Sequence, residues 1–460
     1  MASIALPLTS GQLVDGAPMS TTIFGQDGGA VVRRSILPGG VRVLTEAMPG
    51  QRSASIGFWI GVGSRDEAVG QHGSTHFLEH LLFKGTQRRT ALEIASAFDE
   101  VGGESNAATA KESTCYYARV LDTDLPMAID VIADMVTSAV LDPDELEQER
   151  DVILEEIAMD GDDPTDVAHE HFVAAVLGEH PLGRPIGGTP DAIRAVARDS
   201  VWEHYRRYYR PSELVVTAAG GLDHDVVCRL VLEALRNAGW QLEDGAAPVE
   251  RRSTVAAEIF GRPGLTVVKR QVEQANVIVG CPSITATDDR RYVMSVLNAV
   301  LGGGMSSRLF QEIREKRGLV YSTYSFASAY ADAGYFGMYG GCSPAKVPQV
   351  LALMDAELSK LATHGVTEDE LRKAVGQLSG GIVLALEDTG SRMSRLGRAE
   401  LVSGEFQDVD ETLSQIRGVT AEQVRGLAAQ LGAAPRSVTV VGPFEETETF
   451  GLSSESGLSL

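Results

Sequence analysis

Apolar residues along the chain follow two periods, so that short strands and amphipathic helices succeed one another. VRVLTEA at Val41–Ala47 and SASIGFWIGV at Ser53–Val62 are alternating or continuously apolar and are bounded by turn residues, which predicts buried strands. Apolar residues three or four apart predict helices at Thr90–Val101 and Pro126–Val140, with two strands between them in 104–120. This mixture of elements indicates an α+β protein.

The second half of the chain restarts with a similar rhythm. Its predicted elements are strands near Thr266–Val268 and Asn276–Gly280, a helix from about Asp289 to Leu301, and a strand pair within Val320–Gly340. The tripeptide Asp-Glu-Leu, which opens a long predicted helix at Asp144, recurs at Asp369. We interpret this recurrence as a duplication that gives two homologous halves.

Breaks in composition set the expected domain boundaries. Residues 1–31 mix Gly, Ser, Thr and Pro without clear periodicity and are expected to form an N-terminal extension. A polar segment rich in Gly, Pro and Ala begins a linker that we place at 241–262. Residues 445–460 form an acidic, Ser-rich tail that we expect to be disordered. The two halves then occupy 32–240 and 263–444.

The stretch GSTHFLEHLLFKG, Gly73–Gly85, carries the clearest chemical signal. His76 and His80 are four residues apart, so on a helix both imidazoles leave the same face and can bind one ion. Glu79 lies beside them, close enough to accept a proton from a metal-bound water. This His-x-x-Glu-His order is the inverted form of a zinc-binding helix, and its apolar neighbours indicate that the helix is buried. We predict Zn²⁺ at this site, and the motif is absent from the second half.

A zinc ion held by two histidines needs a third protein ligand if one position stays open for water. The predicted helix from about Asp144 to Met159 places Glu149 and Glu156 two turns apart on one face. Glu156 could be the third ligand, with Glu149 supporting the site from behind. On spacing alone, a solvated acidic face is the better explanation of both residues.

Composition limits the classes of function. A net charge of −23, from 40 basic and 63 acidic residues, disfavours nucleic acid and anionic membrane surfaces as partners and is compatible with a basic substrate. The four cysteines are far apart, and the chain shows neither an apolar run of membrane-spanning length nor the apolar core of a signal peptide. We expect a cytoplasmic protein.

His169, Glu170 and His171 form a second metal-capable cluster, but histidines two residues apart diverge on a helix, so we expect these to be surface residues.

Four segments resemble, in order and spacing, the pitrilysin-type (M16) metallopeptidases, especially the mitochondrial processing peptidase β-subunit and its bacterial relatives. The segments are HFLEHLLFKGT, GGESNAATAKESTCYYARV, ERDVILEEI and HPLGRPIGG, and the resemblance covers roughly residues 34–442. It implies two homologous α/β-roll halves that form a clamshell around a cavity. It also implies zinc held by His76, His80 and Glu156, with Glu79 as general base and Glu149 in support.

The resemblance implies further roles outside the metal motif. Arg314 and Tyr321, which alone would be called ordinary surface residues, resemble a pair that contacts the substrate and its polarised carbonyl. Asn106 and Ala107 fall in a segment that resembles the edge strand on which a peptide substrate is added as a β-strand. Gly302–Ser307 resembles a glycine-rich element that captures substrate, and a helix C-cap is an equally good interpretation.

These expectations combine into one functional hypothesis and one alternative. The hypothesis is a zinc-dependent endopeptidase, processing-peptidase-like, that cleaves extended or unfolded peptides. We expect a homodimer with no nucleic-acid or membrane partner. The alternative is a non-catalytic peptide-binding or scaffold protein of the same fold, although such a protein has no need of the base Glu79.

Overall fold

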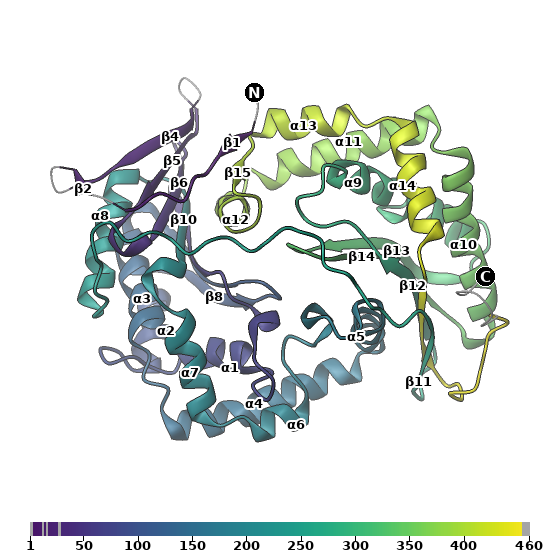
Figure 1. Cartoon of the computed structure of the whole chain (residues 1–460), viewed down its shortest axis with the longest axis horizontal. Helices are drawn as coiled ribbons and strands as arrows, with labels where there is room; N and C mark the ends of the chain where they lie inside the picture. The colour runs from purple at the N-terminus through teal and green to yellow at the C-terminus, as the bar shows by residue number, and fades with distance from the viewer. Residues whose placement is uncertain (1–2, 12, 15–16, 26–28, 453–460) are drawn as a thin grey trace. The chain divides into compact units, whose positions relative to one another are not determined.

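A computed structural model describes residues 3–11, 13–14, 17–25 and 29–452 (Figure 1). Contacts divide the chain into two compact units, neither of which is continuous in sequence. The first unit comprises Met1–Ile157, Pro185–Arg252 and Leu384–Asp408, and the second comprises Ala158–Arg184, Ser253–Val383 and Val409–Leu460.

The first unit is built on a seven-stranded sheet of order β4-β5-β6-β10-β7-β9-β8 (Figure 1). Its strands are β4 (Ser20–Gly25), β5 (Val31–Ile36), β6 (Arg42–Ala47), β10 (Leu214–Gly220), β7 (Ser53–Ile60), β9 (Thr114–Leu121) and β8 (Glu104–Thr109). Strands β6 and β10 are parallel, and every other neighbouring pair is antiparallel. The run LVVTAAG of β10 is buried throughout, as expected of a central strand that is covered on both faces.

Helices cover both faces of this sheet. Alternate residues of β7, among them Ile56 and Phe58, face the core shared with α3 (Leu125–Ser138) and α8 (His224–Asn237). The other face packs against α12 (Thr389–Arg398). A Cβ atom built on Gly57 would lie 2.4 Å from Met393 Sδ, so this helix approaches the strand closely at the glycine.

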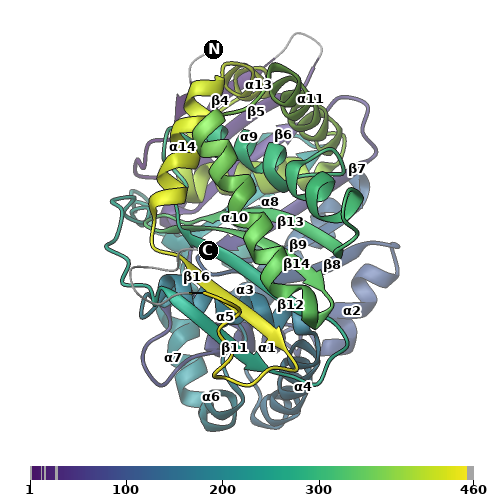
Figure 2. The same cartoon turned by 90° about the vertical axis from the view of Figure 1, so that its right-hand side faces the viewer.

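The sheet of the second unit, which faces the viewer in Figure 2, repeats the topology of five of the seven strands of the first. This sheet has the order β11-β16-β12-β14-β13, formed by Gly264–Lys269, Ser437–Gly442, Ala275–Pro282, Gly334–Cys342 and Val320–Ala329. Parallel and antiparallel neighbours follow the same sequence as in β6-β10-β7-β9-β8. Helices α10 (Val347–His364) and α14 (Ala421–Ala433) pack together as α3 and α8 do. The predicted duplication and α+β class are therefore confirmed.

One helix of each sequence half belongs to the unit formed mainly by the other half. Helix α5 (Pro164–Leu177) packs on β12 and β16 of the second unit, and a Cβ on Gly280 would lie 2.5 Å from Phe172 Cζ. Helix α12, from the second half of the sequence, packs in the first unit. The compact units therefore group residues differently from the predicted domains 32–240 and 263–444, which are continuous in sequence. Those domain boundaries stay a prediction.

Both chain ends contribute more to the fold than expected. In the predicted extension, β4 pairs with β5, and Leu6 is buried beside Phe406. The side chains of β4 do not alternate clearly, because its place is set by main-chain pairing at a sheet edge. In the tail, the ring of Phe450 packs 4.8 Å from that of Phe444, so the expected disorder is wrong for 445–452. Residues 453–460 lie outside the described part.

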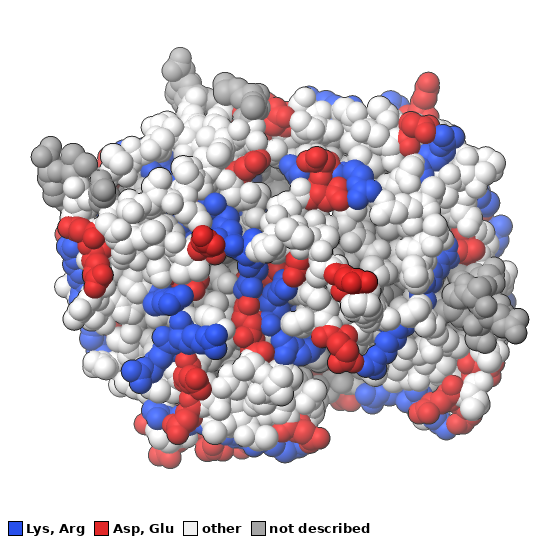
Figure 3. Space-filling model, in the orientation of Figure 1, with Lys and Arg blue, Asp and Glu red and all other residues white. Residues whose placement is uncertain are grey.

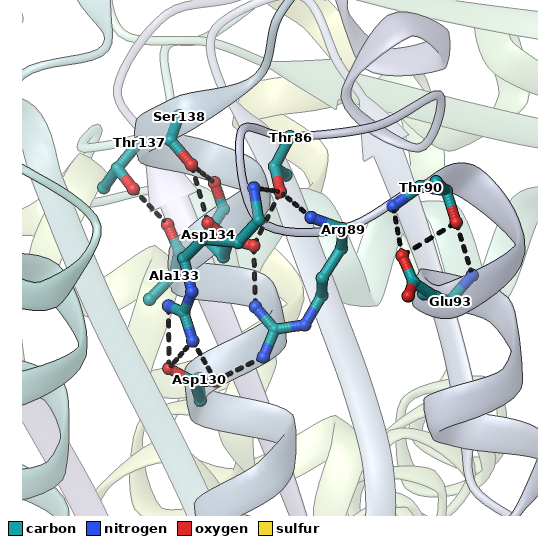
Figure 4. A network of polar contacts seen from close by, with 10 residues as sticks. Thr86, Arg89, Thr90, Glu93, Asp130, Ala133, Asp134, Thr137 and Ser138 are labelled. Atoms are coloured by element: carbon teal, nitrogen blue, oxygen red, sulfur yellow. Dashed lines mark hydrogen bonds and ion pairs between the residues drawn. The ribbon is translucent and has the colours of Figure 1, made fainter.

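A buried polar network anchors the loop that follows α1 (Figure 4). Asp134 of α3 is fully buried, and its Oδ2 accepts hydrogen bonds from Thr86 Oγ1 at 2.7 Å and from Arg89 Nη1 at 2.6 Å. Its Oδ1 accepts from Ser138 Oγ at 2.6 Å, and Arg89 also binds Asp130. The network thus ties the loop after α1 to α3, and α4 (Pro143–Asp162) follows α3 along the chain.

Acidic and basic side chains are interspersed on the face shown in Figure 3. Within the described residues, no helix is both long enough and apolar enough to cross a bilayer.

Candidate metal centre

Helix α1 (Ser74–Leu82) forms where the inverted motif predicted it. Phe77, Leu78 and Leu81 on one side are buried in the core of the first unit. His76, Glu79 and His80 are half-buried on the other side. The helical period thus separates the packing face from the face that carries the polar side chains.

Glu156 of α4 lies opposite the two histidines. Its Oε2 is 3.6 Å from His76 Nε2 and 3.6 Å from His80 Nε2. All three ligand atoms lie within 4.8 Å of one another. Tetrahedral zinc with ligands at about 2.0–2.1 Å separates those ligands by roughly 3.4 Å, so this donor set fits zinc. No other group of three His, Cys, Asp or Glu ligands converges in this way among the described residues.

Glu149 supports the site from the same helix. His80 Nδ1 donates to Glu149 Oε2 at 2.9 Å, which leaves the Nε2 lone pair of His80 facing Glu156. Lys84 Nζ is 2.5 Å from Glu149 Oε1. Burial raises the pKa of Glu149, but the hydrogen bonds from Lys84 and His80 outweigh it, and the pKa is lowered overall. A solvated acidic face is therefore wrong for Glu149, whose side chain is only 6% exposed, while Glu156 is 47% exposed.

The candidate base Glu79 is held by a residue that the sequence alone did not single out. Thr109 Oγ1 of β8 donates a short hydrogen bond to Glu79 Oε2. Thr109 lies on the same face of β8 as the buried Ala107, because side chains two residues apart in a strand share a face. This alternation was the sequence feature that could have indicated Thr109. Strand β8 is an edge of its sheet, as the resemblance implied for Asn106 and Ala107. Asn106 is exposed, and its Oδ1 accepts from Ala107 N at 2.8 Å.

A second residue that sequence reasoning missed caps the start of the metal helix. The buried carboxylate of Glu67 accepts from Gly73 N and Thr75 N, each at 2.8 Å, where the positive end of the helix dipole lies. Gly187, within the segment HPLGRPIGG, also lies near this end, because a Cβ on Gly187 would be 3.7 Å from His76 Nδ1. Gly73 itself has φ +90°.

Arg314 and Tyr321 lie together in the second unit. Arg314 belongs to a short π-helical segment, Phe310–Glu315, and its guanidinium carbon is 5.2 Å from the ring centroid of Tyr321 on β13. The Tyr321 side chain is 76% exposed. Their predicted contact with substrate stays a prediction.

The glycine-rich segment Gly302–Ser307 begins at a helix end. Helix α9 (Arg291–Gly302) stops with Gly303 as its C-cap, in accord with the capping interpretation. A Cβ on Gly302 would lie 2.1 Å from Ser325 N, so this glycine is required by close packing against β13. A role in substrate capture stays a prediction.

His169 differs from the expectation. It was expected at the surface with Glu170 and His171, which are indeed exposed. His169 instead is half-buried, and its Nε2 lies 2.9 Å from the hydroxyl of Tyr324, whose ring it stacks on. The expectation failed because α5 packs on a sheet formed by the other half of the sequence.

A zinc-binding helix with the inverted order His-x-x-Glu-His is typical of the inverzincin class of peptidases. The family description "Insulinase (Peptidase family M16)" matches residues 42–190, and "Peptidase M16 inactive domain" matches 195–378. An uncharacterized zinc protease of Streptomyces coelicolor is 50% identical over 443 residues, 96% of each chain. One of Bacillus subtilis is 38% identical over 413 residues, 90% of this chain and 98% of that one. The chain belongs to peptidase family M16, as its four segments indicated.

Solved structures show the same fold. A peptidase M16 inactive domain from Pseudomonas fluorescens aligns with a TM-score of 0.81 at 18% identity, covering 91% of this chain and 99% of that one. A protease from Helicobacter pylori aligns with a TM-score of 0.77 at 21% identity, covering 93% and 100%. At these identities the likeness concerns the fold alone.

Proposed function

We propose that this chain is a zinc-dependent endopeptidase that cleaves extended or unfolded peptides. The convergence of His76, His80 and Glu156, with Glu79 on the same helix as the histidines, is the observation that carries the proposal. Membership of family M16 and the zinc-protease names of the relatives support it. A protein that only bound peptides would have no use for a carboxylate in the position of Glu79.

The chemistry divides between the ion and the chain. Zinc, when bound, lowers the pKa of a ligated water and polarises a carbonyl group. Glu79 would accept the proton of the attacking water through the carboxylate oxygen to which Thr109 does not donate. Glu79 then passes this proton to the leaving amine nitrogen, which completes hydrolysis of the peptide bond.

The proposed substrate follows from main-chain recognition. An edge strand such as β8 presents N–H and C=O groups to which an extended peptide adds as a further strand. The contact between Asn106 Oδ1 and Ala107 N must open for that N–H to bind substrate. Main-chain pairing tolerates many sequences but requires an extended chain, which favours unfolded peptides. For the half-buried Arg314 and the exposed Tyr321 we propose contact with the substrate through their donor groups.

Cleavage of defined peptides with and without chelator tests the proposal. Purified protein is incubated with an unstructured peptide and with a tightly folded domain of similar composition, and products are identified by mass spectrometry. We expect fragments from the unstructured peptide, their loss on chelation and their return when zinc is added. Retention of the peptide without zinc-dependent fragments would instead indicate a binding protein. The homodimer inferred from the resemblance is tested by sedimentation of the same preparation.

A further inference from the structure

Lys84 lies one helical turn beyond His80, just past the end of α1, and reaches the same carboxylate that His80 binds. Its Nζ is 2.5 Å from Glu149 Oε1, while His80 Nδ1 is 2.9 Å from Glu149 Oε2. The two oxygens of Glu149 are thus divided between an ammonium group and a ligand imidazole. The Glu149 side chain is 6% exposed, so bulk water has little access to replace either partner.

This division restricts the ways in which the carboxylate can turn. A carboxylate held at one oxygen only can rotate about its terminal bond and draw away from the imidazole. With Lys84 on Oε1, the plane of the group is fixed and Oε2 stays on His80 Nδ1. That contact orients the ring so that Nε2 faces Glu156.

We propose that Lys84 is a positioning residue of the metal centre, which acts through Glu149 to hold His80 in its ligating orientation and so strengthens zinc binding. The inference rests on the zinc site proposed above. Outer contacts of this kind typically change metal affinity 10–100-fold when they are removed.

If Lys84 acted only through its charge, its removal would change the zinc affinity in the opposite direction. A cation near a divalent ion repels it, so a lysine that acted only through its charge would weaken zinc binding, and its removal would tighten it. The direction of the change in zinc affinity therefore separates positioning from simple repulsion.

The test measures the zinc dissociation constant of the full chain by competition with a chromophoric chelator. If the unsubstituted chain does not bind zinc, the proposed function fails and the Lys84 variants are not needed to show it. If it binds, Lys84→Met is expected to raise the dissociation constant about 10-fold or more, and Lys84→Arg to restore most of the affinity. An unchanged or lower dissociation constant for Lys84→Met would overturn the inference about Lys84 alone.

A double substitution tests whether Lys84 acts through Glu149. Glu149→Gln alone is expected to weaken zinc binding, and adding Lys84→Met to it is expected to change affinity less than about 2-fold. A full additional 10-fold loss in the Glu149→Gln background would contradict action through Glu149. Lys346→Met, at an exposed lysine of the second unit, is the matched control and should leave affinity unchanged. Thermal unfolding of each metal-free variant verifies that the chain is folded, and loss of affinity in a fully folded Lys84→Met protein supports positioning.

Discussion

Asp134→Asn tests whether the buried network behind α1 stabilises the first unit. The carboxylate accepts from Thr86, Arg89 and Ser138 and has no exposed surface (Figure 4). Asparagine keeps the shape but turns one acceptor into an N–H donor, which must face either the guanidinium or a hydroxyl. Breaking a fully buried ion pair costs about 3–5 kcal/mol. Because Arg89 is 19% exposed and keeps Asp130 as a partner, we expect a loss of about 2–3 kcal/mol.

Calorimetry of the purified chain provides the assay for this loss. A change of 2–3 kcal/mol in a unit of this size corresponds to a fall of about 5–10 °C in the unfolding midpoint. Asp130→Asn is the matched control, because its carboxylate binds the same arginine but is 34% exposed, and it should cost less than about 1 kcal/mol. Equal midpoints for the two variants would refute the claim that burial makes Asp134 the dominant member of the network.

Two further predictions concern acid stability and the start of the metal helix. Burial lowers the pKa of His204 and of His224 to about 4, so the unfolded chain takes up protons first as the pH falls. The free energy of unfolding should decrease between about pH 6.5 and pH 4, by up to about 3 kcal/mol per histidine. Urea titrations at several pH values should show a weaker pH dependence for His204→Gln than for the wild type. An unchanged pH dependence in this variant would contradict the role of His204. Gly73→Ala places a Cβ 2.4 Å from Ile193 Cδ1 at a φ of +90°, and we expect a loss of about 2–3 kcal/mol by urea unfolding. Gly239→Ala is the control, because Gly239 has a φ of +102° and open space around it, so that only backbone strain acts there. This variant should lose about 1 kcal/mol of unfolding free energy. An equal loss of unfolding free energy in the two variants would exclude a packing role for Gly73.

Local periodicity was enough to predict the helix that carries the histidines. The spacing of His76, Glu79 and His80 determines which face they share, and the apolar residues between them determine which face is buried. The same reasoning placed Glu149 and Glu156 on one face of α4 but could not bring that face to α1. Their convergence depends on tertiary packing, and only the resemblance to a family gave it in advance.

The supporting contacts were beyond reach of the sequence for the same reason. Thr109, Lys84 and Glu67 each contact a residue of another segment. The period of two places Thr109 on the same strand face as Ala107, but no period along the chain specifies the partner of any of the three residues. His169 was misplaced because α5 packs on strands from the other half of the sequence. Connections of this kind are properties of topology rather than of any local pattern.

The central claim is that Glu79 acts as the base beside a zinc ion bound by His76, His80 and Glu156. Its most direct test compares the cleavage rate of one unstructured peptide by zinc-loaded wild-type protein and by zinc-loaded Glu79→Gln, with the zinc content of both measured. We predict that the variant retains its zinc and loses at least about 100-fold in rate. A variant that keeps both its zinc and a rate within a few-fold of the wild type would contradict the assignment.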